Sequence, residues 1–171
     1  AYTGKWHLDG GPYMGDGVPA PGFEPQWWYD GQSYIDEYGE EFVRSQRKSG
    51  SLENKIALDL PEEKAWGTRV ADRAIDFLNT VKDDEKFVLC VSFDEPHGPF
   101  MCPKKYYDMV DLDEFPIRPN FNAEVGNKPE LQQLHAAIHN TTKEDLHAYM
   151  TYFYACNMYI DRQIGRVIDA V

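Results

Sequence analysis

The sequence predicts an α/β fold in which a central sheet, largely parallel or mixed, is flanked by helices. The first observation is a helical pattern over residues 66–82, where Val70, Ala74 and Leu78 share one helical face. The second is an apolar run at residues 87–93, which follows a short charged turn and is rich in strand-forming residues. A helix, a short turn and an apolar strand make half of a parallel α/β unit.

Local signals set the expected boundaries of these elements. Thr68 is a plausible N-cap for the helix over residues 66–82. The strand at residues 87–93 is apolar on both faces, so we expect it inside a sheet that helices cover on both sides. Residues 55–60 predict one further short strand.

The last third of the chain predicts one long amphipathic helix at about residues 142–171. Its apolar residues recur every three or four positions, which marks a single helical face. Thr141 is the expected N-cap, and Glu144 is placed to complete a capping box.

Residues at about 8–34 predict a long loop. Glycine and proline interrupt regular structure throughout this stretch, yet it also carries many aromatic side chains that are costly to leave in water. We therefore expect an ordered loop packed against the domain. Long ordered loops in compact domains tend to be functional.

Composition limits the classes of protein that this chain can belong to. Its 171 residues fit one domain, and 42% hydrophobic residues are enough for a sizeable core. Acidic residues outnumber basic ones by 29 to 17, a net charge of −12 that disfavours nucleic-acid binding. No apolar run is long enough to predict a membrane span, and no signal peptide is visible at the start.

The three cysteines predict no disulfide framework. Cys90, Cys102 and Cys156 are scattered and form no Cys-x-x-Cys pair, so at most one bridge can form. Cys90 lies in the apolar run and Cys156 in the helical pattern, where a cysteine usually acts as a small buried hydrophobe.

The first candidate for chemistry is the pair Lys5 and His7. In an extended segment a spacing of two residues places both side chains on one face. An ammonium group beside an imidazole suits an anionic tetrahedral group, with charge from the lysine and a proton or hydrogen bond from the histidine. The alternative is a solvated lysine and a loop histidine, which spacing alone favours.

The second candidate is His97, in the segment Asp94-Glu95-Pro96-His97-Gly98-Pro99. This segment begins where the strand at residues 87–93 ends, and ligands in α/β sheets bind beyond the carboxyl ends of strands. The two prolines and the glycine stiffen and bend the backbone around His97. A plain turn is the alternative, and the position favours function.

The other histidines predict no metal site in this chain. His135 and His139 have helical i, i+4 spacing, but Ala136 stands where a zincin motif requires glutamate. Neither they nor His147 has an evident third ligand, so we interpret them as structural or surface residues.

Several motifs together resemble the sulfatase family of the alkaline phosphatase superfamily. The segment Gly4-Lys5-Trp6-His7-Leu8 is similar to the second signature of that family, and Glu95 to Phe100 to its substrate-histidine loop. Residues 159–167 resemble the helix that follows this loop in many bacterial sulfatases, and residues 68–78 resemble the helix before the strand. The four motifs occur in the family's order over nearly the whole chain.

The resemblance implies hydrolysis of a sulfate ester by a formylglycine, which is made from cysteine or serine and attacks sulfur as its hydrate. It also implies a calcium ion at the sulfate. By this likeness Lys5 binds the sulfate and the formylglycine hydrate, and His7 assists release of sulfate from the covalent intermediate. His97 contacts the sulfate and helps to protonate the leaving alcohol.

The chain lacks two features of the family pattern, the nucleophile motif and the metal ligands. None of its cysteines or serines lies in the nucleophile motif, and the paired aspartates of the metal site are missing. The resemblance therefore implies that residues 1–171 are an internal part of a sulfatase domain, with the formylglycine and the calcium ligands in the remainder of the parent chain. We expect the isolated segment to be inactive. The resemblance is compatible with a periplasmic, an extracellular or a cytoplasmic location.

A sulfated carbohydrate is the expected substrate class, because Trp27 and Trp28 in the aromatic loop can stack on sugar faces. That these two residues only cover a sheet edge is equally compatible with the sequence. Two alternatives for the function stay open. One is a phosphonate monoester or phosphodiester hydrolase of the same superfamily, and the other is a catalytically dead relative that binds glycans.

Overall fold

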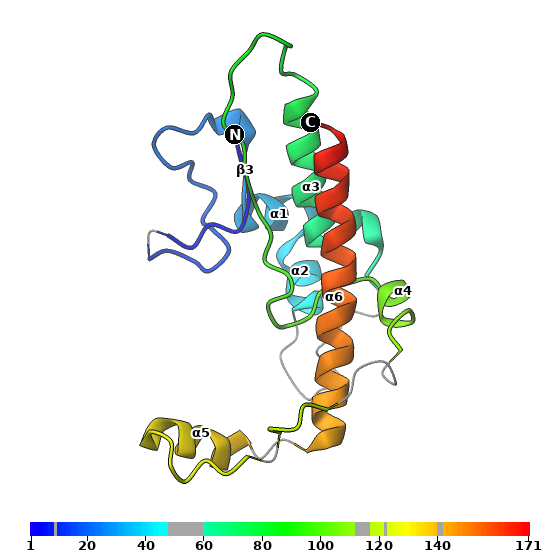
Figure 1. Ribbon diagram of the computed structural model, residues 1–171. Coiled ribbons are helices and arrows are strands. Elements are labelled where there is room, and N and C mark those ends of the chain that lie inside the picture. Colours follow the sequence, from blue (N-terminus) through cyan, green and yellow to red (C-terminus); the bar gives the residue numbers. More distant parts are fainter. Residues whose placement is uncertain (9, 48–59, 112–116, 122, 140–141) are drawn as a thin grey trace.

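The computed structural model describes residues 1–8, 10–47, 60–111, 117–121, 123–139 and 142–171 (Figure 1). Among them is one parallel sheet with the strand order β2-β1-β3, where β1 is Tyr2–Gly4, β2 is Trp28–Tyr29 and β3 is Cys90–Ser92. Tyr2 is in register with Trp28 on one side and with Cys90 on the other. Together with the helices beside the sheet, this arrangement confirms the predicted α/β fold.

Gly4 allows β1 and β3 to approach each other closely at their carboxyl ends. Its φ is +118°, and a Cβ atom at this position would lie 1.9 Å from the carbonyl oxygen of Ser92. The next backbone amide, that of Lys5, donates to the same oxygen at 2.8 Å. Only glycine fits this geometry, which accounts for the residue that precedes Lys5.

The two long helices, α3 (Trp66–Leu78) and α6 (Lys143–Asp169), lie side by side, and α3 packs on the sheet (Figure 1). Gly67 permits this packing, because a Cβ there would lie 2.6 Å from Cδ1 of Ile160. The backbone amide of Thr68 donates to the hydroxyl of Tyr159 at 2.6 Å. Both predicted helices are confirmed, and α3 ends at Leu78 rather than at residue 82.

The predicted caps of these helices were wrong by a few residues. Ala65, not Thr68, is the N-cap of α3, because the helix already begins at Trp66. In α6 the capping box joins Thr142 to Asp145 instead of Thr141 to Glu144. Both pairs have the spacing that a capping box requires, so the sequence does not distinguish them.

The segment predicted as a loop at residues 8–34 contains regular structure in its second half. A short 3-10 helix, η1 (Pro25–Trp27), leads into β2, and α1 (Gly31–Tyr38) begins directly after it. Asp30 is the N-cap of α1, and its buried carboxylate accepts from two backbone amides of that helix. A second helix, α2 (Glu40–Gln46), follows.

The strand predicted at residues 87–93 is shorter and less buried than expected. Only Cys90–Ser92 pair with β1, and β3 has a partner on one side only among the described residues. Val88 is therefore 76% exposed, and Cys90 is exposed where a buried cysteine was expected. Cys156 is buried, as predicted, and it is a free cysteine.

The remaining elements are short or lie at the periphery. They are η3 (Glu62–Lys64), α4 (Lys104–Tyr107) and α5 (Glu130–His139). The strand predicted at residues 55–60 lies, apart from Leu60, outside the described residues. Within the described part of the chain, none of the helices has the length and apolar character needed to cross a membrane.

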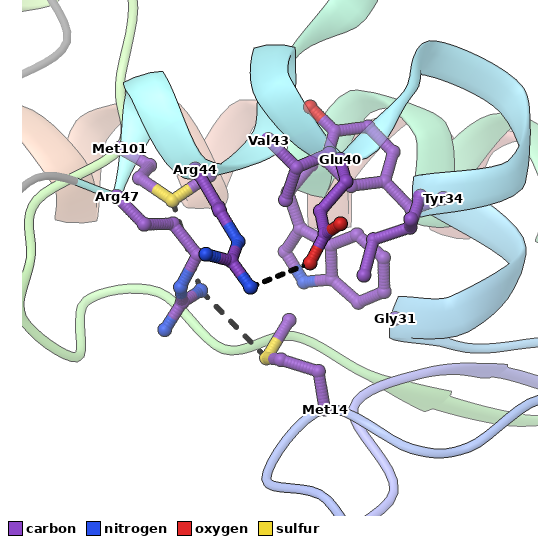
Figure 2. Close-up of a pocket in the computed structure, with 10 residues that line it drawn as sticks. Met14, Gly31, Tyr34, Glu40, Val43, Arg44, Arg47 and Met101 are labelled. Atoms are coloured by element: carbon purple, nitrogen blue, oxygen red, sulfur yellow. Dashed lines mark hydrogen bonds and ion pairs between the residues drawn. The ribbon is translucent and has the colours of Figure 1, made fainter.

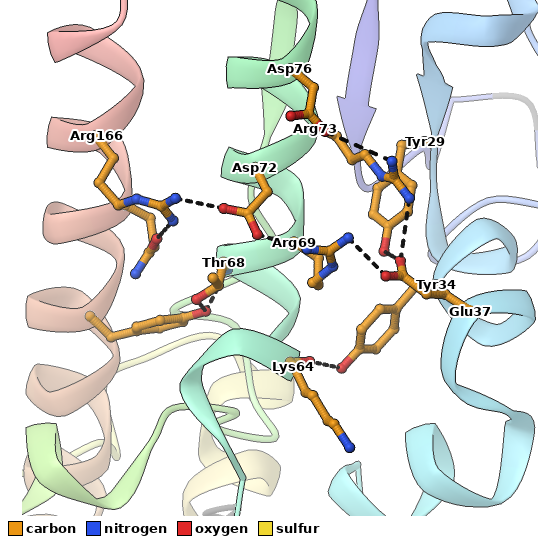
Figure 3. A network of polar contacts seen from close by, with 12 residues as sticks. Tyr29, Tyr34, Glu37, Lys64, Thr68, Arg69, Asp72, Arg73, Asp76 and Arg166 are labelled. Atoms are coloured by element: carbon orange, nitrogen blue, oxygen red, sulfur yellow. Dashed lines mark hydrogen bonds and ion pairs between the residues drawn. The ribbon is translucent and has the colours of Figure 1, made fainter.

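A chain of ion pairs ties α1, α3 and α6 together (Figure 3). Arg166 of α6 binds Asp72 of α3 at 2.6 Å, and Asp72 also binds Arg69 at 2.7 Å. Arg69 reaches Glu37 of α1 at 2.8 Å, and Glu37 accepts from the hydroxyl of Tyr29 in β2 at 2.9 Å. These contacts fix the helices relative to the sheet that carries the candidate site.

Candidate functional site

Two of the predicted site segments meet at the carboxyl ends of neighbouring parallel strands. Lys5 directly follows β1, and Asp94 comes two residues after the end of β3. The Nζ atom of Lys5 lies 3.2 Å from Oδ1 of Asp94. The position agrees with the rule that ligands in α/β sheets bind beyond the carboxyl ends of strands.

Asp94 is the buried centre of a charged group. It accepts a hydrogen bond from the hydroxyl of Tyr13 at 2.8 Å, and its other oxygen lies 3.3 Å from Nη1 of Arg47. Its side chain is 5% exposed. A buried carboxylate needs such partners, and here two cations and a phenol supply them.

The ring of Tyr13 brings the three predicted catalytic residues together. The Lys5 ammonium lies 3.6 Å from the ring centroid, within cation–π range. The imidazole of His7 lies 4.9 Å from the same centroid and that of His97 lies 5.4 Å from it. Lys5, His7 and His97 therefore all contact one aromatic ring.

The contacts of Lys5 and Tyr13 determine the protonation states of both side chains. Burial alone would lower the pKa of Lys5, but hydrogen bonds with Tyr13 and Asp94 raise this pKa above the ordinary lysine value. Burial also raises the pKa of Tyr13, and the Asp94 carboxylate adds to this effect. At neutral pH Lys5 is therefore an ammonium ion and Tyr13 a neutral phenol.

His7 and His97 are exposed, so both imidazoles are accessible to a ligand. The backbone amide of His97 donates to the carbonyl of Asp94 at 2.9 Å, which closes the turn that carries this histidine. Nδ1 of His97 lies 2.6 Å from the carbonyl oxygen of Gly98. This contact orients Nε2 away from the backbone of the turn.

Glu95 anchors the His97 turn to the start of α3. Its buried carboxylate accepts from the backbone amide of Gly67 at 3.1 Å, at the amino end of the helix. Burial raises the pKa of Glu95 to about 8. A buried hydrogen bond therefore fixes the turn to α3, while His97 stays exposed.

Trp27 and Trp28, predicted to bind a sugar, pack against aromatic residues of the fold. Trp28 is buried and stacks on Tyr2, and its indole nitrogen donates to Asp30 at 3.1 Å. Trp27 packs edge-on against Phe77 of α3. Trp28 pairs with Tyr2 at the amino end of β1, whereas Lys5 follows the carboxyl end of that strand.

Sequence reasoning missed Tyr13, Asp94 and Arg47. Asp94 is the first residue of the His97 segment, and its charge directly after the apolar run at residues 87–93 was a usable signal. Tyr13 and Arg47 carried no such signal, because their partners are 81 and 47 residues away. Among the described residues no group of three or more histidine, cysteine, aspartate or glutamate side chains is arranged to hold a metal ion.

Comparison with known proteins shows the family of this chain. The family model described as Sulfatase matches residues 1–171. The chain belongs to the sulfatase family. It is 36% identical over 173 residues to the uncharacterized sulfatase YidJ of Escherichia coli, covering 99% of this chain and 35% of that protein.

A second relative is the ulvan-active sulfatase of Formosa agariphila. It is 31% identical to this sulfatase chain over 144 residues, which cover 80% of the chain and 26% of the relative. The sulfatase chain thus spans about a third of the length of the curated relatives it matches. The resemblance inferred from the Lys5–His7 and His97 segments is confirmed at the level of the family.

Proposed function

We propose that the protein to which this chain belongs hydrolyses a sulfate ester, and that residues 1–171 supply its Lys5–His7–His97 group. The observation that carries the proposal is the convergence of these three side chains on the ring of Tyr13. They come from two segments 90 residues apart, both at the carboxyl ends of parallel strands. An ammonium ion and two imidazoles on one surface suit a tetrahedral anion.

Lys5 is proposed to bind a sulfate oxygen. It remains charged because Asp94 and Tyr13 stabilise its protonated form. Arg47 shares the Asp94 carboxylate, so the group of two cations and one carboxylate keeps a net positive charge for an incoming anion. Charge that is fixed before the reaction contributes more than charge that must reorient during it.

The two histidines are proposed to divide the proton transfers. His97 protonates the leaving alcohol or donates a hydrogen bond to it, and His7 takes up a proton as sulfate is released. Both rings are exposed and contact the same tyrosine, so one bound sulfate ester can reach both. A general acid and a general base on two sides of one group permit turnover.

A formylglycine nucleophile is also part of the proposal, and it would supply the oxygen that attacks sulfur. The described cysteines do not fit this role, since Cys102 and Cys156 are buried and Cys90 lies in β3. A calcium ion does not fit the described residues either, because Asp94 is already shared by two cations. Both groups are proposed to depend on residues outside this chain.

The proposed function is tested with the full-length protein, by comparing 4-nitrophenyl sulfate with 4-nitrophenyl phosphate and a phenyl phosphonate ester. The proposal expects the highest kcat/KM for the sulfate ester. A preference for phosphate or phosphonate by about tenfold or more would assign the protein to another hydrolase class of the superfamily. No turnover of any ester would favour a role in binding glycans.

A further inference from the structure

Cys102 and Cys156 are two buried thiols that contact each other across different elements of the fold. Both residues are 0% exposed, and both are free cysteines. The Cys156 thiol is hydrogen-bonded to the side chain of Cys102. Cys102 lies between the His97 turn and α4, whereas Cys156 lies within α6, so the contact joins two segments that are distant in the chain.

Aromatic contacts on both sides hold the two cysteines against each other. Phe100 packs on Tyr152 of α6, with the ring centroids 6.1 Å apart. Tyr106 packs on Tyr159 of the same helix at 5.3 Å. Cys156 lies about one helical turn from each of these α6 tyrosines and shares their face of the helix. The segment that carries the other cysteine is therefore anchored to α6 before and after the pair.

The segment after His97 connects this cysteine pair to the candidate site. Met101, which precedes Cys102, has its sulfur atom 3.7 Å from Nη1 of Arg47 (Figure 2). The same Arg47 atom lies 3.3 Å from the carboxylate of Asp94. A covalent bond at Cys102 would therefore hold the segment that follows His97 against α6.

We propose that Cys102 and Cys156 are a redox-active pair, a dithiol in reducing surroundings and a disulfide in oxidising ones. In the oxidation, one thiolate attacks a sulfur of a disulfide oxidant such as oxidised glutathione, which forms a mixed disulfide and releases one glutathione thiolate. The second thiolate attacks the cysteine sulfur of this mixed disulfide, so the Cys102–Cys156 bond forms and the second glutathione leaves. The cysteines lose two protons and two electrons, and the oxidant is reduced to two thiols.

A disulfide suits this pair better than a metal ion does. Structural zinc sites take four ligands, and among the described residues no third histidine, cysteine, aspartate or glutamate joins the two thiols in a metal-holding group. A disulfide needs only two cysteines whose side chains face each other closely. The proposal does not depend on the sulfate-ester hydrolysis proposed above.

The surroundings of the pair determine when it reacts. The hydrogen bond with Cys102, burial and the charge of Glu95 all raise the pKa of Cys156 above the ordinary thiol value. The thiolate is the reactive form, so the buried pair reacts slowly while the fold is closed. Oxidation therefore proceeds as the chain folds, or when the segment after His97 opens locally.

The test uses the full-length protein in glutathione buffers that range from reducing to oxidising, with urea below the unfolding transition so that the segment can open. Free thiols are then blocked with N-ethylmaleimide in denaturant, and tryptic peptides are identified by mass spectrometry. Cys102→Ala and Cys156→Ala each remove one partner. Cys90→Ser is the control, because Cys90 is exposed and lies in β3.

We expect oxidising buffers to give a peptide pair joined through Cys102 and Cys156, both in the wild type and in Cys90→Ser, and dithiothreitol to separate it. The bridged protein should melt several degrees above its reduced form, because the bond closes a long loop. This difference should vanish in Cys102→Ala and Cys156→Ala. The proposal is overturned if Cys102 and Cys156 carry N-ethylmaleimide or glutathione in every buffer without a bridge, or if either one pairs with Cys90 instead.

Discussion

The Nζ atom of Lys5 and Oδ1 of Asp94 lie 3.2 Å apart, although 89 positions separate the two residues in the chain. Their contact joins the end of β1 to the end of β3, and it explains how Lys5 stays charged while partly buried. Asp94 thereby acts as a positioning residue, since it reaches a substrate only through Lys5. Single substitutions of Lys5, Asp94 and the residues around them can therefore test the candidate site.

Replacing Asp94 should shift the pH dependence of activity. In Asp94→Asn the carboxylate that raises the pKa of Lys5 is lost, so burial lowers this pKa. The alkaline limb of kcat/KM, which reports groups of the free enzyme, is expected to move to lower pH. Profiles between pH 7 and 11 measure the shift.

Asp94→Glu is the matched variant, because it keeps the negative charge. Its alkaline limb of kcat/KM should lie between those of Asp94→Asn and the wild type. If kcat/KM of Asp94→Asn is lower at every pH but its alkaline limb does not move, Asp94 does not act by raising the pKa of Lys5.

The ring and the hydroxyl of Tyr13 should contribute separately. Tyr13→Phe keeps the ring beside Lys5, His7 and His97 but loses the hydrogen bond to Asp94, so kcat/KM should fall about fivefold. Tyr13→Leu also removes the cation–π contact and should cost about tenfold more. Steady-state kinetics of the full-length protein distinguish the two. Equal losses in both variants would show that the ring does not position the three residues.

Gly4 should tolerate no side chain. In Gly4→Ala the new Cβ would lie 1.9 Å from the Ser92 carbonyl oxygen, so the ends of β1 and β3 must separate. We expect the free energy of unfolding to fall by more than about 3 kcal/mol.

Gly10→Ala is the control for backbone conformation alone, since Gly10 has a φ of +76° but no atom within 4 Å of the added Cβ. Its cost should be about 1 kcal/mol. Equal destabilisation of the two variants in urea would contradict the close approach at Gly4.

Glu95 should make stability depend on pH. Burial raises its pKa in the folded state from 4.5 to about 8, so in this range the folded protein holds a proton that the unfolded chain releases. The contribution of Glu95 to stability is therefore greatest below pH 4.5 and falls as the pH rises to about 8.

Glu95→Gln keeps the acceptor for Gly67 without this ionisation, and at pH 8 it should be more stable than the wild type by about 2 kcal/mol or more. Thermal unfolding between pH 5 and 9 measures the difference. The exposed Glu63→Gln serves as control. A wild-type stability that rises across this range would argue against a protonated Glu95.

The sequence was most informative where its signal was local. The apolar face of residues 66–82 predicted α3, which ends at Leu78, and the Lys5–His7 and His97 segments carried the family resemblance. The caps of α6 shifted by one residue because two neighbouring threonines are each followed by an acidic residue three positions later. Nothing in the local pattern separated the two.

The sequence did not predict contacts between segments that are distant in the chain. Tyr13 contacts Asp94 across 81 positions of the chain, and Arg47 contacts it from the end of α2. The aromatic loop suggested sugar-binding tryptophans, but Trp28 became part of the packing around Tyr2. The indole nitrogen of Trp28 donates a hydrogen bond to Asp30, and no pattern within the loop predicted this contact.

In the proposed function, Lys5 binds the sulfate of an ester undergoing hydrolysis. The most direct measurement is sulfate release from 4-nitrophenyl sulfate by the full-length protein and by its Lys5→Met variant, with the exposed Lys143→Met as control. Methionine keeps most of the length of the side chain without the charge, so kcat/KM should fall at least about 100-fold in Lys5→Met and stay near the wild-type value in the control. If Lys5→Met releases sulfate as fast as the wild type, the account is contradicted.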